Sequence, residues 1–145
     1  MFKHILLPTD GSETSKSAIQ KCITFAKENG AKVTGLHVIP EYQFLTYQTE
    51  MLADTREQYA KDSILHAKKI LAEIETAAKE AGVECETLYV TSEYPHEAIV
   101  KAANDEQCDL IIMATHGRKG VQRLFLGSET QKVLTLSPIP VLVFR

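Results

Sequence analysis

The sequence contains no tryptophan, only three cysteines and no long apolar segment, and the last two shortages each argue against a class of protein. Cys22, Cys85 and Cys108 are odd in number and far apart, which argues against a disulfide framework or a C-x-x-C metal or redox motif. We expect reduced, mostly buried thiols in a cytoplasmic protein. No apolar run approaches the ~18 residues of a membrane span. The first apolar run, closed by Pro8, is also too short for a signal peptide.

Basic charge is also scarce, since the formal net charge is −3. Nucleic-acid-binding domains are usually basic, so we expect no nucleic-acid partner. The 145 residues correspond to one domain, residues 1–145. A chain of this length buries roughly 68–70% of its unfolded surface, which is enough for a full core.

Short apolar runs alternate with amphipathic stretches along the whole chain. This alternation predicts an α/β fold, a three-layer, doubly wound sheet of five parallel strands with helices on both faces. We expect strands over 3–8, 32–39, 83–90, 110–114 and 141–144, and helices over 13–29, 55–81, 95–106 and 128–136. The stretch 41–54 is polar and aromatic without a clear period, and we interpret it as a loop with room for a short helix.

The longest expected helix carries one apolar stripe. Its members are spaced alternately four and three residues apart, and they are Ala60, Ile64, Ala67, Leu71, Ile74, Ala78 and Ala81. Because alanine takes four of the seven positions, a helix packed on a sheet fits better than a coiled-coil seam.

Residues 109–131 combine a buried strand, a glycine-rich loop and a helix start. The loop contains Gly117, Gly120 and Gly127, with basic residues between them. Glycine lets the backbone approach a ligand, and the N-terminus of a helix offers unpaired N–H groups and a partial positive charge. The arrangement therefore predicts an anion site. Ser128 and Gln131 also match a capping box, worth about 1 kcal/mol to the helix.

The spacing in this loop is Ala114-x-x-Gly117, nine residues, then Gly127-Ser128. It resembles the nucleotide loop of the universal stress protein family, G-x-x-G, nine residues, G-[ST], with Ala114 in place of the first glycine. The resemblance extends over the whole chain, from ILLPTDGS to PVLVFR. It implies the strand order 3-2-1-4-5, which places a crevice between the first and fourth strands. It also implies ATP in that crevice, with Mg²⁺ held mainly through the phosphates.

The resemblance assigns the cofactor-binding residues to two groups. Those expected around the adenosine are Pro8, Thr9, Asp10, Val38 and Met113. Those expected around the ribose and phosphates are Ala114, His116, Gly117, Arg118, Gly127, Ser128, Glu129 and Thr130. We predict neither catalytic residues nor metal ligands, because His37 and His116 have no second ligand at useful spacing.

Several of these residues also have a purely structural interpretation. Asp10 fits an ordinary turn at the start of a helix, Val38 and Met113 fit the core, and His116 fits a residue that shapes the loop. Glu129 suits the first turn of a helix, but its carboxylate would oppose a triphosphate if it pointed inward.

The leading hypothesis is a stress-response switch that binds ATP with little or no hydrolysis. Ala114 and Glu129 favour a first alternative, a dimeric interaction module that has lost nucleotide binding. The second alternative is an enzyme, a slow ATPase or an adenylyl-transfer enzyme. The sequence shows neither G-x-S-x-G nor paired metal carboxylates in support of it.

The last expected strand, 140–144, is apolar and lies at a sheet edge in the implied order. Only Arg145 follows it in this sequence. An uncovered apolar edge invites pairing with another chain, and the family resemblance points to the same strand. We therefore expect a homodimer through this strand.

Overall fold

The computed structural model describes residues 1–42, 49–115 and 127–145, with the backbone alone from 49 to 54. The strands are β1 (His4–Pro8), β2 (Lys32–Ile39), β3 (Cys85–Thr91), β4 (Leu110–Ala114) and β5 (Val141–Phe144). The helices are α1 (Glu13–Asn29), α2 (Thr49–Ala81), α3 (Pro95–Asp105) and α4 (Ser128–Leu136). All strand pairs are parallel and follow the order β3-β2-β1-β4-β5, which confirms the predicted fold class.

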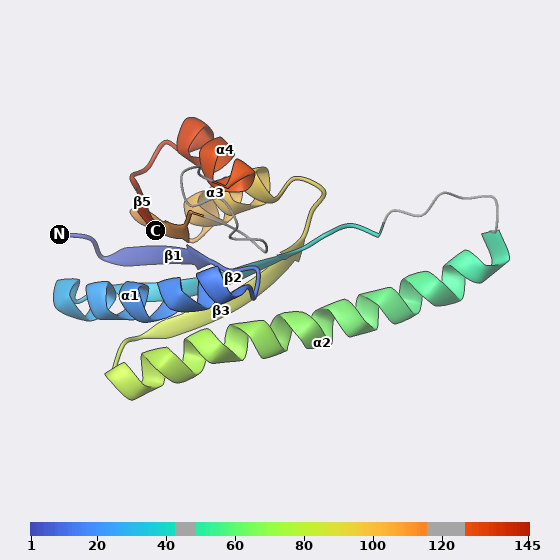
Figure 1. Cartoon of the computed structure of the whole chain (residues 1–145), viewed down its shortest axis with the longest axis horizontal. Coiled ribbons are helices and arrows are strands. Elements are labelled where there is room, and N and C mark those ends of the chain that lie inside the picture. The colour runs from blue at the N-terminus through green and yellow to red at the C-terminus, as the bar shows by residue number, and fades with distance from the viewer. Residues whose placement is uncertain (43–48, 116–126) are drawn as a thin grey trace.

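Helices cover both faces of the sheet, with α1 and α2 on one side and α3 and α4 on the other (Figure 1). Alternate residues of β1 supply both layers of the core. Ile5 and Leu7 pack with residues of α1 and α2, whereas Leu6 packs with residues of α3 and α4. This strand is therefore apolar throughout its centre, as expected of a parallel strand buried on both faces.

The order of the strands reverses at β1. It pairs with β2 on one side, where Pro8 lies opposite Leu36, and with β4 on the other, where Leu6 lies opposite Ile111. The connection after β1 enters α1 on one face, and the connection after β4 leads to α4 on the other (Figure 1). Diverging connections of this kind leave a crevice at the carboxyl ends of the two strands.

The structure corrects some predicted element boundaries. Helix α2 begins at Thr49, six residues before the predicted start at Thr55, and its first turns extend beyond the sheet (Figure 1). The predicted apolar stripe is buried from Ala67 to Ala78, whereas Ala60 is exposed and Ile64 and Ala81 are half-buried. Apolar periodicity reports burial, so it marks the buried turns of α2 and not the residue where the helix begins.

Strand β3 begins at Cys85 rather than at the predicted Val83. The N–H of Val83 donates to Ala78 O at 2.8 Å and so belongs to the turn that ends α2. The remaining part of the predicted loop, residues 43–48, lies outside the described residues.

A glycine sets the turn from β1 into α1. Gly11 has φ +80°, a conformation that side chains disfavour, and a Cβ there would lie 2.9 Å from Ile70 Cδ1. Ser12 then caps α1 by accepting a hydrogen bond from Ser15 N–H at 3.2 Å. Because Gly11 lacks a side chain, the turn is compact and α2 packs directly against it through Ile70.

Gly11→Ala should lower the free energy of unfolding by about 2–4 kcal/mol, from the unfavourable φ and the contact with Ile70 together. Gly30→Ala is the matched control, because Gly30 has φ +65° but a Cβ at this position would meet no described neighbour within 4 Å. The control should cost only about 1 kcal/mol. Urea denaturation measures both values, and equal losses would show that the contact with Ile70 contributes nothing.

Candidate functional site

A cavity of about 340 Å³ lies at the carboxyl ends of β1, β2 and β4. This volume falls within the ~300–1,000 Å³ of typical small-molecule sites. The cavity brings together most of the predicted site residues, from stretches far apart in the sequence. They are Pro8, Thr9, Asp10, Val38, Met113, Ala114, Gly127, Ser128, Glu129 and Thr130.

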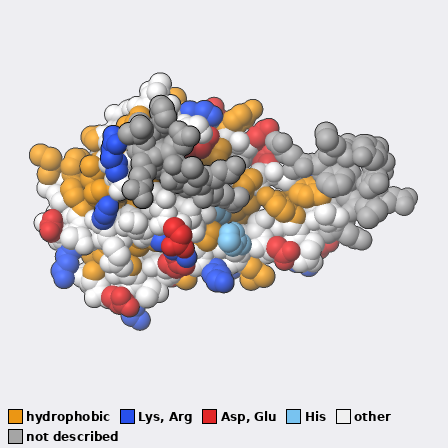
Figure 2. Space-filling model, in the orientation of Figure 1, with side chains coloured by type: hydrophobic (Ala, Val, Ile, Leu, Met, Phe, Trp, Pro, Cys, Tyr) orange, Lys and Arg blue, Asp and Glu red, His pale blue; other side chains and the backbone are white. Residues whose placement is uncertain are grey.

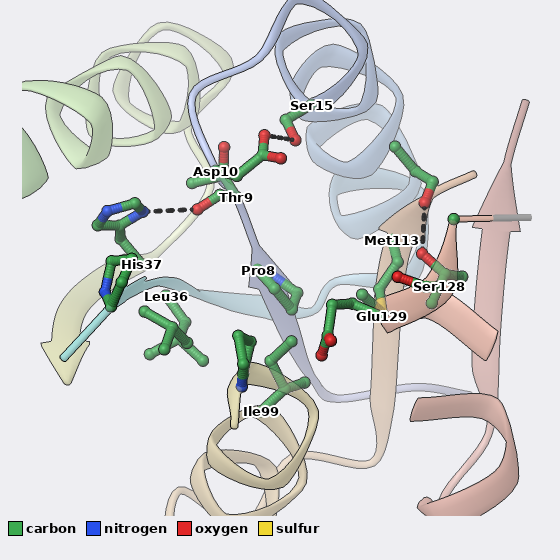
Figure 3. Close-up of a pocket in the computed structure, with 16 residues that line it drawn as sticks. Pro8, Thr9, Asp10, Ser15, Leu36, His37, Ile99, Met113, Ser128 and Glu129 are labelled. Carbon is green, nitrogen blue, oxygen red and sulfur yellow. Dashed lines mark hydrogen bonds between the residues drawn. The ribbon is translucent and has the colours of Figure 1, made fainter. Parts of the chain in front are cut away.

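The end of β1 is tied to β2 by two hydrogen bonds. Thr9 N–H donates to Leu36 O at 2.8 Å, and His37 Nδ1 lies 2.9 Å from Thr9 O (Figure 3). A carbonyl oxygen only accepts, so the proton of the imidazole is on Nδ1. The buried His37 side chain therefore links the carboxyl ends of β1 and β2.

Asp10 follows directly and lines the cavity. Its Oδ1 accepts a hydrogen bond from Ser15 Oγ at 2.8 Å (Figure 3) and another from Ser12 N–H at 2.9 Å. The turn interpretation of this aspartate is thus correct, and it is compatible with a place in the site. The turn holds the carboxylate at the mouth of the crevice.

The opposite wall of the cavity is apolar. Leu36, Val38, Ile99 and Met113 line it and pack in or against one core cluster. Leu36 and Ile99 were not among the predicted site residues. Leu36 shares a face of β2 with Val38, and Ile99 lies on the inward side of α3. The two-residue period of the strand and the 3.6-residue period of the helix could therefore have identified both residues as neighbours of the site.

The N-terminus of α4 forms the third side of the cavity. Gly127 is its N-cap, and the first helical bond runs from Gln131 N–H to Gly127 O at 3.0 Å. Ser128 is therefore the first helical residue, not the cap, and the predicted capping box is wrong by one position. In a helix that begins here, the N–H groups of Ser128, Glu129 and Thr130 have no intrahelical acceptor. All three residues line the cavity.

The side chain of Glu129 extends from α4 toward the start of α3 (Figure 3). Its Oε2 accepts a hydrogen bond from His96 N–H at 2.9 Å and lies 3.0 Å from His96 Nδ1. Its Oε1 lies 3.4 Å from Lys132 Nζ. The carboxylate therefore bridges two helices at the edge of the cavity.

Comparison with known proteins identifies the family and the fold. The universal stress protein family matches residues 1–145. This chain is a member of that family. The universal stress protein in the QAH/OAS sulfhydrylase 3′ region of Thermus aquaticus is 37% identical over 148 residues, with 100% of both chains covered.

Solved structures of the family have the same architecture. That of MJ0577, a universal stress protein of Methanocaldococcus jannaschii, has a TM-score of 0.83 at 34% identity, covering 99% of this chain and 95% of that one. A universal stress protein in complex with cAMP has a TM-score of 0.67 at 22% identity, with 99% and 97% covered. One from Archaeoglobus fulgidus in complex with dAMP has a TM-score of 0.71 at 16% identity, with 100% and 98% covered. At 22% and 16% identity, the last two structures show that the fold is shared.

The remaining site residues that the family pattern implies are His116, Gly117 and Arg118. They fall within residues 116–126 and lie outside the described residues. Among the described residues that line the cavity, none is lysine or arginine. Nor do the described residues contain a group of three or more His, Cys, Asp or Glu able to hold a metal ion.

The cysteines have no place in the described lining of the cavity. Burial raises the pKa of Cys22 to about 12. Burial, with the nearby Glu106 and Asp109, also raises the pKa of Cys108 to about 12. Thiols with such pKa values stay protonated at neutral pH and are poor nucleophiles.

None of the helices in the described ranges combines the length and the apolar character that a membrane span requires.

Thr130 joins the start of α4 to the end of β4. The residue is 5% exposed, and its Oγ1 donates to Ala114 O at 2.9 Å. Its hydroxyl was expected to reach a phosphate, but the structure shows it bonded to the strand. The contact holds the N-terminus of α4 against the cavity.

Thr130→Val should lower the free energy of unfolding by about 1–3 kcal/mol, because the half-buried Ala114 carbonyl loses the donor that the buried Thr130 supplies. Thr135→Val is the matched control, since Thr135 is exposed and its Oγ1 donates to Gln131 O within the same helix at 3.0 Å. We expect the control to cost less than about 0.5 kcal/mol. Chemical denaturation compares the variants, and an unchanged stability for Thr130→Val would mean that this hydroxyl does not hold α4.

Proposed function

We propose that this universal stress protein binds an adenine nucleotide in the cavity between β1 and β4. The base would lie against the apolar wall of Leu36, Val38 and Ile99, with the ribose near Asp10. The phosphate would meet the first N–H groups of α4. The observation that carries the proposal is that one cavity joins an apolar wall to an open helix N-terminus.

The family pattern indicates ATP as the ligand, with Mg²⁺ held mainly through the phosphates. The site residues fit this cofactor, because the backbone N–H groups of Ser128 to Thr130 have no partner within their own helix. The relatives whose structures contain cAMP or dAMP support an adenine nucleotide more generally. The three free cysteines fit a cytoplasmic location.

We further propose that the bound nucleotide acts as a switch and is hydrolysed slowly or not at all. Hydrolysis needs a group that orients a water molecule for in-line attack. Each described titratable side chain in the cavity lining is already held by a neighbour. Asp10 is bonded to Ser12 and Ser15, His37 to Thr9, and Glu129 to His96. The slow ATPase is thus the less favoured alternative.

The base end of the proposed site is tested by Val38→Phe, which fills the cavity. ATP at 100 times its Kd should stabilise the wild-type protein by about 2.7 kcal/mol, and the larger side chain should weaken binding about tenfold or more. Val90→Phe is the control, because Val90 pairs with Val38 on the next strand and packs on the same core cluster without lining the cavity. Thermal shift and calorimetry measure both effects.

The phosphate end is tested in the same titrations by Ser128→Pro. Proline is tolerated at the first helical position, and the extended Gly127 before it has φ −61° and ψ 147°, so only one N–H is lost. A hydrogen bond to a charged group is worth about 1.5–3 kcal/mol, so ATP should bind about tenfold to a hundredfold more weakly. Ser128→Ala keeps the N–H and should bind normally. A wild-type protein that ATP does not stabilise, and that gives no heat of binding, would instead support the interaction module.

We also propose that the protein forms a homodimer through β5. The sheet has two edges, and β3 carries Glu86 on its edge whereas β5 is entirely apolar. The carbonyls of Pro140 and Phe144 accept hydrogen bonds from Ile111 of β4 and from Thr115, the residue that follows β4. Since backbone groups alternate in direction, those of Val141 and Val143 point to the open edge, where a second copy would pair.

Val143→Pro should convert the dimer to a monomer, because it removes an outward N–H while leaving the bonds to β4 in place. Val143→Ala is the control that shortens the side chain but keeps the N–H. Light scattering after size exclusion gives the mass, and circular dichroism should show an unchanged helical signal. A wild-type monomer at tens of micromolar would rule out the dimer, and a dimer that survives Val143→Pro would place the interface elsewhere.

A further inference from the structure

The starts of two helices lie at this cavity. Helix α3 begins at Pro95 and α4 begins at Ser128, and both residues line the cavity. The first N–H groups of each helix carry partial positive charge and need acceptors. An anionic ligand could in principle bind at either helix end. The ligand's charge will lie at the helix end whose N–H groups have no acceptor yet.

The start of α3 is already occupied by a carboxylate. Its N-cap, Tyr94, makes no side-chain hydrogen bond to the helix. Glu129 supplies the missing acceptor from the neighbouring helix, because its Oε2 receives His96 N–H at 2.9 Å. The N-cap of α4 is Gly127, which has no side chain to offer. Of these two helix starts in the described part of the chain, only that of α4 therefore presents open N–H groups to a ligand.

The position of the Glu129 carboxylate is also fixed. The N–H and the ring Nδ1 of His96 both lie within 3.0 Å of Oε2, and Lys132 approaches Oε1 at 3.4 Å. The side chain is 37% exposed, and that of His96 is 18% exposed. To move away, the carboxylate would leave two bonds and uncap α3. A ligand therefore meets a negative charge held beside the site proposed for its phosphate.

We infer that Glu129 sets the phosphate preference of this site, so that an adenine nucleotide with one phosphate binds more tightly than ATP. The inference rests on the proposed function. One phosphate is matched by the N–H groups of Ser128, Glu129 and Thr130. Each further phosphate adds negative charge near the carboxylate that His96 and Lys132 hold in place. Mg²⁺ would neutralise part of this charge, so we expect ATP to bind more tightly when Mg²⁺ is present.

Glu129→Gln tests the inference, because glutamine keeps the size of the side chain and an oxygen that can accept from His96 N–H. Isothermal titration with adenosine, AMP and ATP, each with and without Mg²⁺, gives the ratio of the ATP Kd to the AMP Kd. For the wild-type protein without Mg²⁺ we expect a ratio of about ten or more, and in Glu129→Gln a ratio at least about fivefold smaller. Adenosine carries no phosphate, so its affinity should be the same in both proteins.

Glu97→Gln is the matched control for loss of a carboxylate near the same helix end. Glu97 lies in the first turn of α3, is exposed and does not line the cavity. The control should keep the wild-type ratio. If Glu129→Gln leaves the ratio unchanged while AMP and ATP both bind, the inference is wrong and the proposed function stands. If neither protein binds any of the three ligands, both are wrong.

Discussion

The burial of β1 on both faces and along both edges is the constraint on which the rest of this structure depends. Ile5, Leu6 and Leu7 are 0%, 0% and 1% exposed, and the strand lies between β2 and β4. Their side chains alternate between two core clusters, so α1 and α2 must cover one face and α3 and α4 the other. β1 ends at Pro8. Beyond it, the connection after β1 leads to α1 on one face of the sheet, and the connection after β4 leads to α4 on the other (Figure 1). The cavity is therefore a consequence of how the central strand is covered.

Helix ends are the second constraint, because the first N–H groups of a helix have no acceptor within that helix. Helix α1 does so locally through Ser12, and the neighbouring Asp10 is held in the same turn. Helix α3 relies on a carboxylate from α4, and α4 itself begins with a glycine. Side chains thus satisfy the starts of α1 and α3, whereas the start of α4 stays open because Gly127 has no side chain.

The local and periodic features of the chain were predictable from the sequence. Apolar runs located the strands, and glycines after helical stretches marked the ends of α1 and α2, where Gly30 and Gly82 have positive φ. The family resemblance supplied the strand order, which short-range patterns do not contain. The same information placed Asp10, Val38 and Gly127 at one cavity.

Contacts between distant residues were not predictable in this way. The bond from His96 to Glu129 joins positions 33 residues apart on different helices, and no spacing in the sequence signals it. The cap of α4 was misplaced by one residue because serine normally outranks glycine at that position. Here Gly127 N–H donates to Thr115 O, so the residue directly before the helix is bonded to the segment that follows β4. Tertiary contact, not local preference, decides where this helix begins.

The start of α4 is held by β4 through backbone and side chain together, and this explains why it can remain open toward the cavity. Gly127 N–H donates to Thr115 O, and Thr130 Oγ1 donates to Ala114 O. The same segment also pairs with β5, since Thr115 N–H donates to Phe144 O at 2.9 Å. The helix position is thus determined by strands that are themselves paired in the sheet. A helix anchored in this way needs no side-chain cap of its own, and its first N–H groups stay available without loss of order at the helix start.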